Sequence, residues 1–401
     1  MTNPRETPER PRALAGKHVV LGVTGSIAAY KAAEIASKLT QMGALVDAVL
    51  TPSAKEFIGE ATFAGLTHRP VSTGLFEPKS ELGMDHVALA RRADILLIAP
   101  ATANTIAKLA FGVADDVITA TALATQVPVL IAPAMDAHMY DAPSTQANVE
   151  MLSHRGCAFA GPAEGRMASG LSGRGRMLEP AEIIGHVRMT LGRDGDLAGR
   201  RVVVSAGGTQ EPLDPVRVIT NHSSGKMGYA VAEAARDRGA SVTLVSAPTA
   251  LPRPVGIEIV SVTTAAEMAD ALSEACDRAD ALIMAAAVSD YRPATRAEQK
   301  MKRLGSDGMA LELVQNPDIL AGINGERLVK VAFAAETEEL VENAGRKLAS
   351  KGASLVVAND VTAEGSGFGS DTNAVTFIRP GGEPERMPLM RKTDVADALL
   401  D

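Results

Sequence analysis

Short apolar runs alternate along the chain with longer segments in which apolar residues recur at helical spacing. Residues 17–23 form one apolar run, a glycine-rich turn follows, and residues 27–42 have the period of a helix that ends at Gly43. Glycine commonly follows a helix because it adopts a positive φ without strain. A second apolar run occupies residues 45–50. Apolar strands that alternate with helices are typical of parallel sheets covered on both faces.

The same order of elements occurs a second time. Residues 201–205 repeat the first strand, segment 238–245 repeats 42–49, and segment 278–285 repeats 92–99. Three matches in the same order indicate two copies of one scaffold. We therefore predict two doubly wound α/β domains, each a mostly parallel three-layer sandwich that binds its ligand at the carboxyl ends of the strands.

The length of the chain and its polar segments predict the domain limits. A chain of 401 residues is too long for one ordinary core. Residues 1–14 are polar and proline-rich and predict a disordered tail instead of a signal peptide. We expect one domain over residues 15–192, a polar, glycine-punctuated linker over 193–198, and a second domain over 199–401.

Composition excludes several classes of function. Aromatic residues make up 3%, there is no Trp, and the net charge is -8, which argues against nucleic-acid binding by stacking or by a basic surface. No apolar run reaches the length of a membrane span. Cys157 and Cys276 are too few for a metal cluster or a disulfide framework. Reduced thiols and a cytoplasmic location are the simple expectation.

The first glycine-rich turn predicts a phosphate site. It contains Gly25 and Ser26 and lies between a strand and a helix, where backbone N–H groups and the helix dipole receive anions. The turn lacks the dinucleotide fingerprint, and the second strand ends in Thr51-Pro52-Ser53 where an NAD site would carry Asp or Glu. We interpret it as a site for a mononucleotide such as FMN; the alternative is a plain strand–helix connection.

The second glycine-rich turn, Ala206-Gly207-Gly208-Thr209, is expected to have the same strand–helix context. The polar segment 221–228 follows it and contains Ser224-Gly225-Lys226, but Thr220 and Met227 break the P-loop pattern. Two hydroxyls, an amide and a lysine within a few residues favour a phosphate or acyl-phosphate site over a solvated helix cap.

Further motifs complete the pattern in both halves. In the first half they are the runs 22–31, 100–105, 133–140 and 170–177, together with Asp85-His86. In the second half they are the runs 221–228, 285–291 and 333–337, together with Asp214-Pro215-Val216-Arg217, Lys300-Met301-Lys302, Asn316-Pro317-Asp318 and Ala358-Asn359-Asp360. With these motifs the chain, over about residues 15 to 400, resembles the bifunctional bacterial coenzyme A biosynthesis family. That family fuses phosphopantothenoylcysteine decarboxylase to phosphopantothenate–cysteine ligase.

The resemblance implies an FMN-dependent decarboxylase in the first half. There the flavin oxidises the cysteine side chain of the substrate to a thioaldehyde, which accepts the charge left by CO2, and then reduces the product. His86 matches the catalytic histidine that moves protons, and Asp136 and Met139 match substrate-binding positions. Without the resemblance, His86 would be a solvated residue, and Met135 and Met139 would be core residues. The residues matched to the cofactor site are Gly25, Ser26, Ser53, Thr102 and Asn104.

Two positions depart from the family pattern. Asp136 stands where some relatives have Asn, and Ser169 stands where the mobile flap often has a Cys that completes the reduction. Ser is a far weaker acid than Cys, whose reference pKa is about 8.5. Either Ser169 acts as a hydrogen-bond donor, or another group protonates the intermediate, or the reductive step is slow.

In the second half the resemblance implies ligation of 4'-phosphopantothenate to cysteine. CTP activates the carboxylate as an acyl-cytidylate, which requires cations and a divalent metal such as Mg2+ on the triphosphate. Lys300 matches the catalytic lysine of a loop between Tyr291 and Leu311, and Arg217 and Asn221 match positions that handle the acyl intermediate. The residues assigned to nucleotide binding are Gly207, Asp290 (also the metal ligand), Lys300, Asp318 and Phe333. Lys347 and Lys351 are added because they lie four residues apart on one predicted helical face and could contact phosphates. Alone, Asp290 could equally cap a helix, and the lysines could simply be solvated.

The leading hypothesis is therefore a bifunctional enzyme of coenzyme A synthesis. Three alternatives remain open: a working ligase with a flavodomain impaired by Ser169, a flavin-binding regulatory protein, and a nicotinamide dehydrogenase. The missing acidic residue after the second strand disfavours the last. The resemblance also implies a homo-oligomer, a dodecamer in which flavodomains form trimers and ligase halves form dimers.

Overall fold

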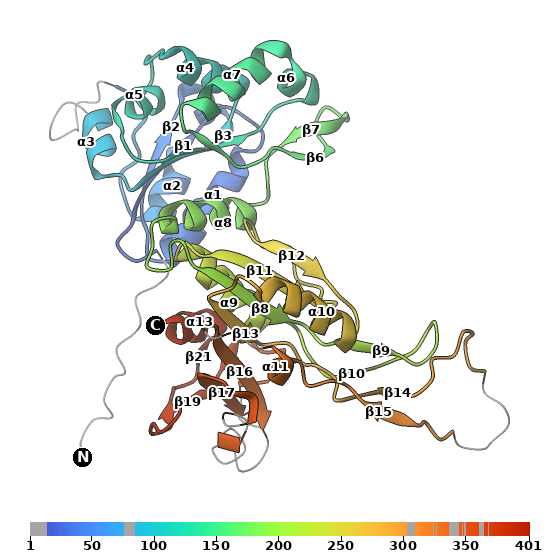
Figure 1. Cartoon of the computed structure of the whole chain (residues 1–401). Helices are drawn as coiled ribbons and strands as arrows, with labels where there is room; N and C mark the ends of the chain where they lie inside the picture. The colour runs from blue at the N-terminus through green and yellow to red at the C-terminus, as the bar shows by residue number, and fades with distance from the viewer. Residues whose placement is uncertain are drawn as a thin grey trace. The chain divides into compact units, whose positions relative to one another are not determined.

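The structure, a computed structural model, describes residues 14–401 except 76–84, 303–308, 324, 326, 337–344, 347, 349, 361–364 and 368. The chain divides between Leu191 and Gly192 into two compact units, each with its own sheet (Figure 1). The tail predicted for residues 1–14 lies outside the described residues, except for Leu14, which is buried in the first core. Within the described ranges, no helix has both the length and the apolar character needed to cross a membrane.

The first unit is built on a parallel sheet in the order β2-β1-β3-β4-β5. These strands are β1 (His18–Val23), β2 (Leu45–Leu50), β3 (Ile95–Ala101), β4 (Val129–Pro133) and β5 (Ala158–Phe159). Alternate residues of each strand face opposite sides, so Leu21 and Val20 belong to different apolar clusters. The sheet therefore separates two cores.

Helices cover both faces of this sheet. The cluster around Leu21 includes side chains of α1 (Ala29–Gln41), α2 (Glu60–Thr67) and α8 (Pro180–Gly192). The cluster around Val20 includes side chains of α3 (Asp85–Arg92), α4 (Ala103–Phe111), α5 (Val117–Ala124) and α7 (Pro143–His154). The short elements η1 (Pro52–Glu56) and α6 (Ala137–Asp141) follow β2 and β4, and β6 (Ala163–Arg166) forms a hairpin with β7 (Ser172–Arg176).

The second unit has an eight-stranded sheet in the order β12-β11-β8-β13-β16-β17-β19-β20. Its strands are β8 (Arg201–Ala206), β11 (Ser241–Ser246), β12 (Glu258–Ser261), β13 (Ala281–Met284), β16 (Val329–Glu336), β17 (Leu355–Asp360), β19 (Val375–Ile378) and β20 (Glu385–Arg386). Only the β17–β19 and β19–β20 pairs are antiparallel. One core contains α9 (Lys226–Asp237) and α13 (Lys392–Leu400), and the other contains α10 (Ala265–Cys276) and α11 (Ile319–Gly322).

The repeat found in the sequence corresponds to equivalent positions in the two sheets. In the first unit β1 pairs with β2 and β3, and in the second unit β8 pairs with β11 and β13 in the same parallel arrangement. The strands continue in the same order as β4-β5 and β16-β17. The prediction of two doubly wound, mostly parallel α/β sandwiches is confirmed.

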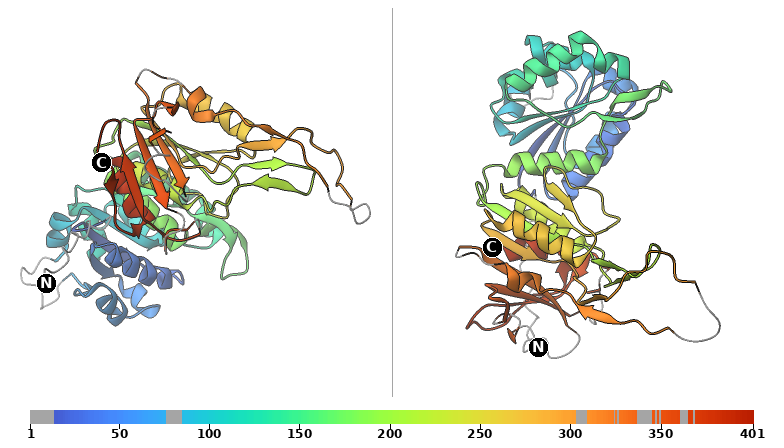
Figure 2. Two further views of the ribbon diagram at one scale, coloured as in Figure 1. Left: turned by 90° about the horizontal axis from the view of Figure 1, so that it is seen from below. Right: turned by 45° about the vertical axis from the view of Figure 1, so that its right-hand side comes forward.

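Two short hairpins extend the second unit as an arm (Figures 1 and 2). They are β9 (Gln210–Pro212) with β10 (Val218–Thr220), and β14 (Tyr291–Pro293) with β15 (Leu313–Gln315). A further pair joins β18 (Thr372–Asn373) to β21 (Met390–Arg391). The hairpin β9–β10 lies between the second glycine-rich turn and α9, so the expectation that a helix directly follows this turn is wrong.

Candidate active sites

Thr24 joins the ends of β1 and β3 in the first unit. The side chain is buried, its Oγ1 donates to the carbonyl of Pro100 at 2.8 Å, and it accepts the N–H of Thr102 at 3.1 Å. Strand β1 lies between β2 and β3, so the order of the strands reverses direction at β1. Ligands of doubly wound sheets bind at such a switch point.

Gly25 lies at the same edge and packs against Ser53, which follows β2. A Cβ atom at Gly25 would lie 2.5 Å from Cβ of Ser53, so no larger residue fits without displacement of the chain. Ser26 accepts the N–H of Ala28 through its Oγ at 3.3 Å, and Thr102 caps α4, whose first turn exposes Asn104. The structure thus brings Gly25, Ser26, Ser53 and Thr102 to one edge, with Asn104 nearby on α4.

The dehydrogenase alternative finds no support at this edge. The only acidic residue of β2 is Asp47, in the middle of the strand. Its buried carboxylate accepts from Arg69 at 2.8 Å and from Arg92 at 2.9 Å. Asp47 therefore stabilises the packing of β2 and is not available to a ribose hydroxyl.

His86 occupies the second position of α3. Its Nδ1 atom is buried and has no hydrogen-bond partner among the described residues. A buried polar nitrogen without a hydrogen-bond partner destabilises a folded protein, so its presence favours a functional role for His86 over that of a solvated surface residue. No hydrogen bond of the described part links His86 to the other predicted residues, and the side chain of Asp85 lies outside that part.

Asp136 and Ser169 contact each other directly. Asp136 caps α6 by accepting the N–H of His138 at 3.0 Å, and Ser169 donates its hydroxyl to Oδ2 of Asp136 at 2.6 Å. The Ser169 hydroxyl, followed by the His138 N–H, lowers the pKa of Asp136 below its ordinary value. Of the roles left open for Ser169, the structure contains that of a hydrogen-bond donor. Its acceptor, Asp136, is the second residue noted as a departure from the family pattern.

Two glycines allow the hairpin that carries Ser169 to lie against the loop after β4. A Cβ atom at Gly175 would lie 2.4 Å from the carbonyl of Met135, and one at Gly173 would lie 2.9 Å from Cβ of Ala137. The N–H of Met135 donates to the carbonyl of Gly175 at 3.0 Å. Met139 is 50% exposed beside this loop, so its interpretation as a core residue is wrong.

Lys31 anchors the chain that follows the hairpin. Its side chain is buried, and its Nζ donates to the carbonyl of Met177 and to Oε1 of Glu179, both at 3.0 Å. No sequence pattern indicated this role, because the partners of Lys31 are far away along the chain. Lys31 fixes one end of the hairpin relative to α1.

The second unit has a comparable edge at the ends of β8, β11 and β13. Gly207 has φ +82°, and a Cβ atom there would lie 2.7 Å from the carbonyl of Ala247. Its own carbonyl accepts the N–H of Ala287 at 2.8 Å. Gly225, at the start of α9, approaches the same turn, with 3.5 Å between its Cβ position and the backbone nitrogen of Gly207. The turn therefore requires glycine for its conformation and for its close contacts.

The segment between β13 and β14 contacts Asn221 and contains Asp290. The Asn221 amide donates to the carbonyl of Val288 at 3.0 Å. Asp290 is exposed, its carboxylate has no partner among the described residues, and Asn316 N–H donates to its carbonyl at 2.8 Å. Strand β14 and not a helix follows Asp290, so its interpretation as a helix cap is wrong.

Arg217 and Lys300 are linked through one backbone unit. Arg217 donates to Oδ2 of Asp214 at 3.1 Å and to the carbonyl of Met301. Asp214 is buried; it lies in a motif noted in the sequence, but no role was predicted for it. Lys300 precedes Met301, and its exposed side chain has no partner within the described ranges.

Asp318 and Lys351 form an ion pair. Asp318 caps α11, and burial acts to raise its pKa, but the Lys351 ammonium and the Ala321 N–H outweigh this and lower it. Lys347 lies outside the described residues. Phe333 is half-buried in β16, and Asn359 of β17 accepts from Ser366 at 2.9 Å. Lys351 is thus neutralised locally unless a ligand displaces Asp318.

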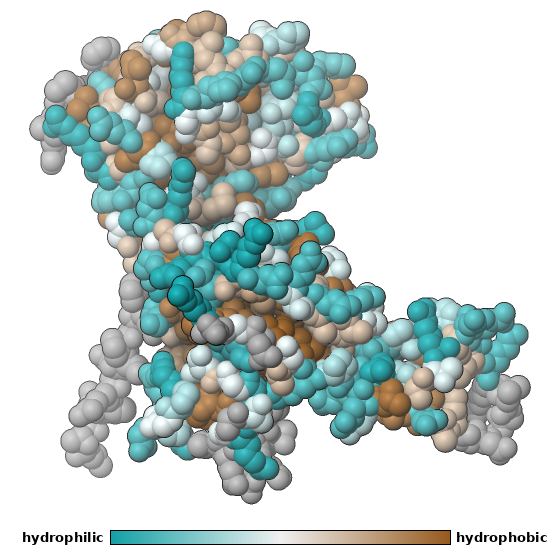
Figure 3. Space-filling view, in the orientation of Figure 1, coloured by the Kyte–Doolittle hydropathy of each residue, from teal (hydrophilic) through white to brown (hydrophobic). Residues whose placement is uncertain are grey.

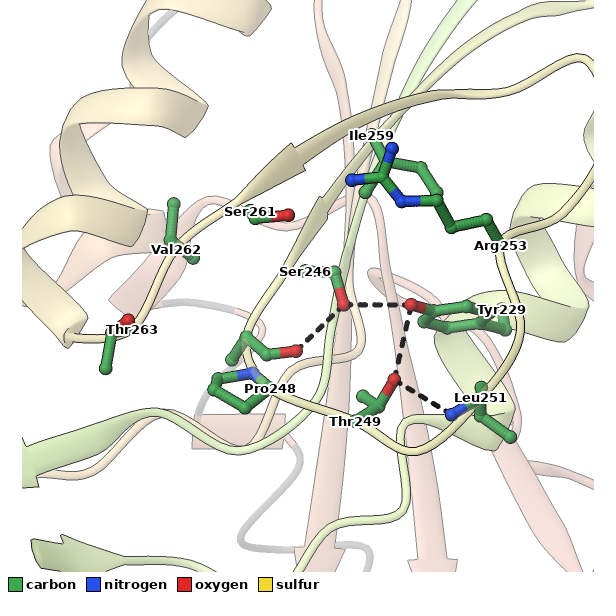
Figure 4. A pocket seen from close by; sticks show the side chains of 11 residues that line it. Tyr229, Ser246, Pro248, Thr249, Leu251, Arg253, Ile259, Ser261, Val262 and Thr263 are labelled. Carbon is green, nitrogen blue, oxygen red and sulfur yellow. Dashed lines mark hydrogen bonds between the residues drawn. The ribbon is translucent and has the colours of Figure 1, made fainter.

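A cavity of about 310 Å³ lies at the ends of β11 and β12 (Figure 4). Tyr229, Ser246 and Thr249 form a chain of hydroxyl contacts in its wall, at 3.2 and 3.3 Å, and Arg253 borders it. None of the residues predicted from the sequence lines this cavity. Ala247 connects it to the Gly207 turn.

Two family models match the two halves of the chain. The model described as Flavoprotein matches residues 7–192, and the model described as DNA/pantothenate metabolism flavoprotein C-terminal domain matches residues 197–401. Together they cover both sheets and both candidate sites.

Curated relatives match nearly the whole chain. A protein of Vibrio vulnificus is 46% identical over 391 residues, covering 96% of this chain and 97% of its own. A protein of Bacillus subtilis is 44% identical over 392 residues, covering 96% of both chains. Both are named Coenzyme A biosynthesis bifunctional protein CoaBC. A crystal structure of the C-terminal domain of a protein of that name is 40% identical, covers 51% of this chain and 93% of its own, and has a TM-score of 0.44.

Proposed function

This chain belongs to the family of bifunctional coenzyme A biosynthesis proteins, and from that membership we propose a division of labour between its two units. The first unit holds FMN and decarboxylates 4'-phosphopantothenoylcysteine to 4'-phosphopantetheine. The second unit joins 4'-phosphopantothenate to cysteine with CTP and Mg2+ through an acyl-cytidylate. The observation that supports this most is that each sheet carries a glycine turn with no room for a side chain at the carboxyl ends of its central strands.

The residues of the first edge fit a flavin phosphate. Gly25 leaves backbone exposed beside Ser53, and Ser26, Thr102 and Asn104 add polar groups around it. When bound, FMN supplies the two-electron oxidation and reduction of the substrate that let CO2 leave. The chain itself contributes the pocket, the orientation of the substrate and the protons.

His86 moves a proton during the first reaction. Its unpartnered Nδ1 is available to a ligand group, and histidine is the side chain that enzymes use most often for proton transfer. Asp136, Met139 and Ser169 surround the substrate from the loop after β4 and from the hairpin. Since Asp136 is ionised at neutral pH, it accepts hydrogen bonds and does not donate them.

In the second unit, Asp290 and Lys300 supply the charges that activate the triphosphate. Asp290 is an exposed carboxylate without a partner in the described part, which suits a divalent cation carried by the nucleotide. Lys300 stabilises the charge that develops during cytidylyl transfer. Arg217 and Asn221 orient the acyl group, while Gly207, Asp318, Phe333, Lys347 and Lys351 complete the nucleotide site.

A second candidate function follows from the Ser169 contact. If the hydroxyl remains bonded to Asp136, the flap cannot supply an acidic proton, and the chain is a ligase with an impaired flavodomain. Release of CO2 from phosphopantothenoylcysteine at ordinary enzyme rates, about 1 s⁻¹ or more, would eliminate this candidate. A flavin-binding regulatory protein would show flavin absorbance but neither reaction.

A homo-oligomer fits the apolar surface of the arm. Figure 3 shows apolar residues on this arm, whose exposed members include Val216, Val218, Tyr291, Leu311 and Leu313. Such a surface is typical of a protein contact. Both cysteines are free, in keeping with the cytoplasmic location predicted from the sequence. Light scattering during size-exclusion chromatography measures the mass of the assembly, and a monomeric mass would contradict the proposed homo-oligomer.

One experiment tests the proposed function. The purified chain is incubated with 4'-phosphopantothenate, cysteine, Mg2+ and either CTP or ATP, and the products are identified by mass. We expect CMP, pyrophosphate and 4'-phosphopantetheine with CTP. Accumulation of phosphopantothenoylcysteine would support the impaired flavodomain, and absence of any amide product would contradict the ligase assignment.

A further inference from the structure

The buried carboxylate of Asp214 binds groups from two distant parts of the chain. Oδ1 accepts the N–H groups of Val216 and Arg217, both at 2.8 Å. Oδ2 accepts Nε of Arg217 and the N–H of Met301, both at 3.1 Å. The side chain is fully buried. A carboxylate offers about four lone-pair positions, and here each meets a donor.

Met301 is held from both sides. Its N–H donates to Asp214, and its carbonyl accepts from Nη2 of Arg217. Asp214 and Arg217 are themselves joined by an ion pair, so the two side chains act as one clamp on a single residue. The N–H in question belongs to the peptide bond that joins Lys300 to Met301, and the clamp therefore fixes the backbone of Lys300.

The preceding segment is tethered to the same arm. The N–H of Ala297 donates to the carbonyl of Leu213 at 3.0 Å, and the N–H of Ala294 donates to the carbonyl of Glu312 at 2.9 Å. The Lys300 side chain, in contrast, is exposed and makes no hydrogen bond or ion pair among the described residues. The backbone is fixed while the ammonium remains free to meet a ligand.

We propose that Asp214 is a positioning residue for ligation: together with Arg217 it clamps Met301 and so holds Lys300 where the triphosphate reacts. This inference rests on the proposed catalytic function of Lys300. Asp214 does not touch the substrate. Its contribution is orientation, for which a misplacement of about 1 Å costs about 100-fold in rate.

Hydrogen exchange of the full-length protein tests the clamp without reference to activity. We expect the Met301 amide to be protected in the unsubstituted protein and to exchange at the rate of an unprotected amide in Asp214→Asn. In that variant the amide oxygen can still accept the turn N–H groups, but the NH2 group faces the Met301 N–H, donor against donor. Full exchange at Met301 in the unsubstituted protein would overturn the proposal, even if the variant does not fold.

Steady-state kinetics test the link to Lys300. We expect Asp214→Asn to lower kcat of ligation by about 10- to 100-fold, with KM for cysteine and the decarboxylation rate of the same chain unchanged. The double variant Asp214→Asn/Lys300→Gln should have the ligation rate of Lys300→Gln alone, because both changes remove the same contribution. Multiplicative losses would show that Asp214 acts independently and would overturn the proposal.

Asp280→Asn is the matched control. Asp280 also accepts a backbone N–H, from Arg201 at 2.8 Å, and pairs with an arginine, Arg200, but it precedes β13, away from the carboxyl ends of the strands. We expect its ligation rate to equal that of the unsubstituted protein. If Lys300→Gln ligates normally, the proposed catalytic role of Lys300 fails and the present inference fails with it, although the ligase assignment stands; if Lys300→Gln is inactive and Asp214→Asn is normal, only the present inference fails.

Discussion

Ser169 donates its hydroxyl to the carboxylate of Asp136 over 2.6 Å, although the two residues are 33 positions apart. The bond joins the turn of the β6–β7 hairpin to the residue that caps α6. Asp136 and Ser169 are the two positions noted in the sequence as departures from the family pattern, and their contact couples these two departures. A substitution at either position should therefore change the hydrogen bonding of the other residue.

Ser169→Ala should shift the pH dependence of decarboxylation. The hydroxyl is the main cause of the lowered pKa of Asp136, so its removal should move that pKa back up toward its ordinary value. The ionised carboxylate would then be lost at a higher pH as the solution is acidified, and the acidic limb of the rate profile should move to higher pH. Ser172→Ala, at an exposed position of the same hairpin, should leave the limb in place. An unchanged limb in Ser169→Ala would contradict the coupling.

Ser169→Cys should accelerate formation of 4'-phosphopantetheine. A thiol is a much stronger acid than a hydroxyl, and general acid catalysis contributes about 10²–10⁴-fold. We expect a gain of about ten-fold or more in single-turnover experiments, with the rate of CO2 release less affected. Equal rates for the unsubstituted protein and the Ser169→Cys variant would show that another group supplies the proton.

His86→Asn and Lys300→Gln should separate the two activities. We expect His86→Asn to reduce decarboxylation by about 10²–10⁴-fold while ligation continues, and Lys300→Gln to do the reverse. The reactions are followed on one sample by CO2 release and by pyrophosphate release. Loss of both activities in a folded variant would show that the units do not work independently.

Gly25→Ala should weaken flavin binding. The added methyl group would lie 2.5 Å from Cβ of Ser53, so the two turns must separate. We expect an increase of at least about ten-fold in the dissociation constant for FMN, equivalent to about 1.4 kcal/mol, measured by flavin fluorescence. Gly65→Ala, in α2 with no atom near its Cβ position, is the control and should bind normally. Normal binding by Gly25→Ala would remove this turn from the cofactor site.

Lys31→Met should destabilise the first unit. The buried ammonium bonds the carbonyl of Met177 and the carboxylate of Glu179, and a buried acceptor without its donor costs about 1–3 kcal/mol. Lys38→Met removes an exposed pair with Glu34 on the same helix and should cost at most about 0.5 kcal/mol. Urea unfolding followed by flavin release compares the two, and equal midpoints would contradict the anchoring role of Lys31.

The strands of both sheets were predictable because their signal is local. Apolar runs 17–23 and 45–50 match β1 (His18–Val23) and β2 (Leu45–Leu50), since a strand buried on both faces must be apolar throughout. The three-residue strands of the arm carry no such signal. They are fixed by tertiary contacts, so the pattern missed the hairpin after the second glycine turn.

The site contacts were less predictable because they join residues far apart in the sequence. Motifs indicated Asp136 and Ser169 separately, but not their hydrogen bond. Helical spacing grouped Lys351 with Lys347, whereas the structure pairs Lys351 with Asp318, 33 residues earlier. Asp214 belonged to a motif, yet its partner Met301 lies 87 residues away. A motif identifies which residues matter, and only the fold determines which of them touch.

The arm that carries Asp214 and Met301 enters the second unit through connections that leave β8 and β13. Both insertions follow the strand ends, so the ladders among β8, β11 and β13 retain the arrangement of β1, β2 and β3. The arm therefore lies outside the strand arrangement that the two sheets share. Designers who wish to change the acid or amine that is joined can rebuild these loops and leave every strand as it is.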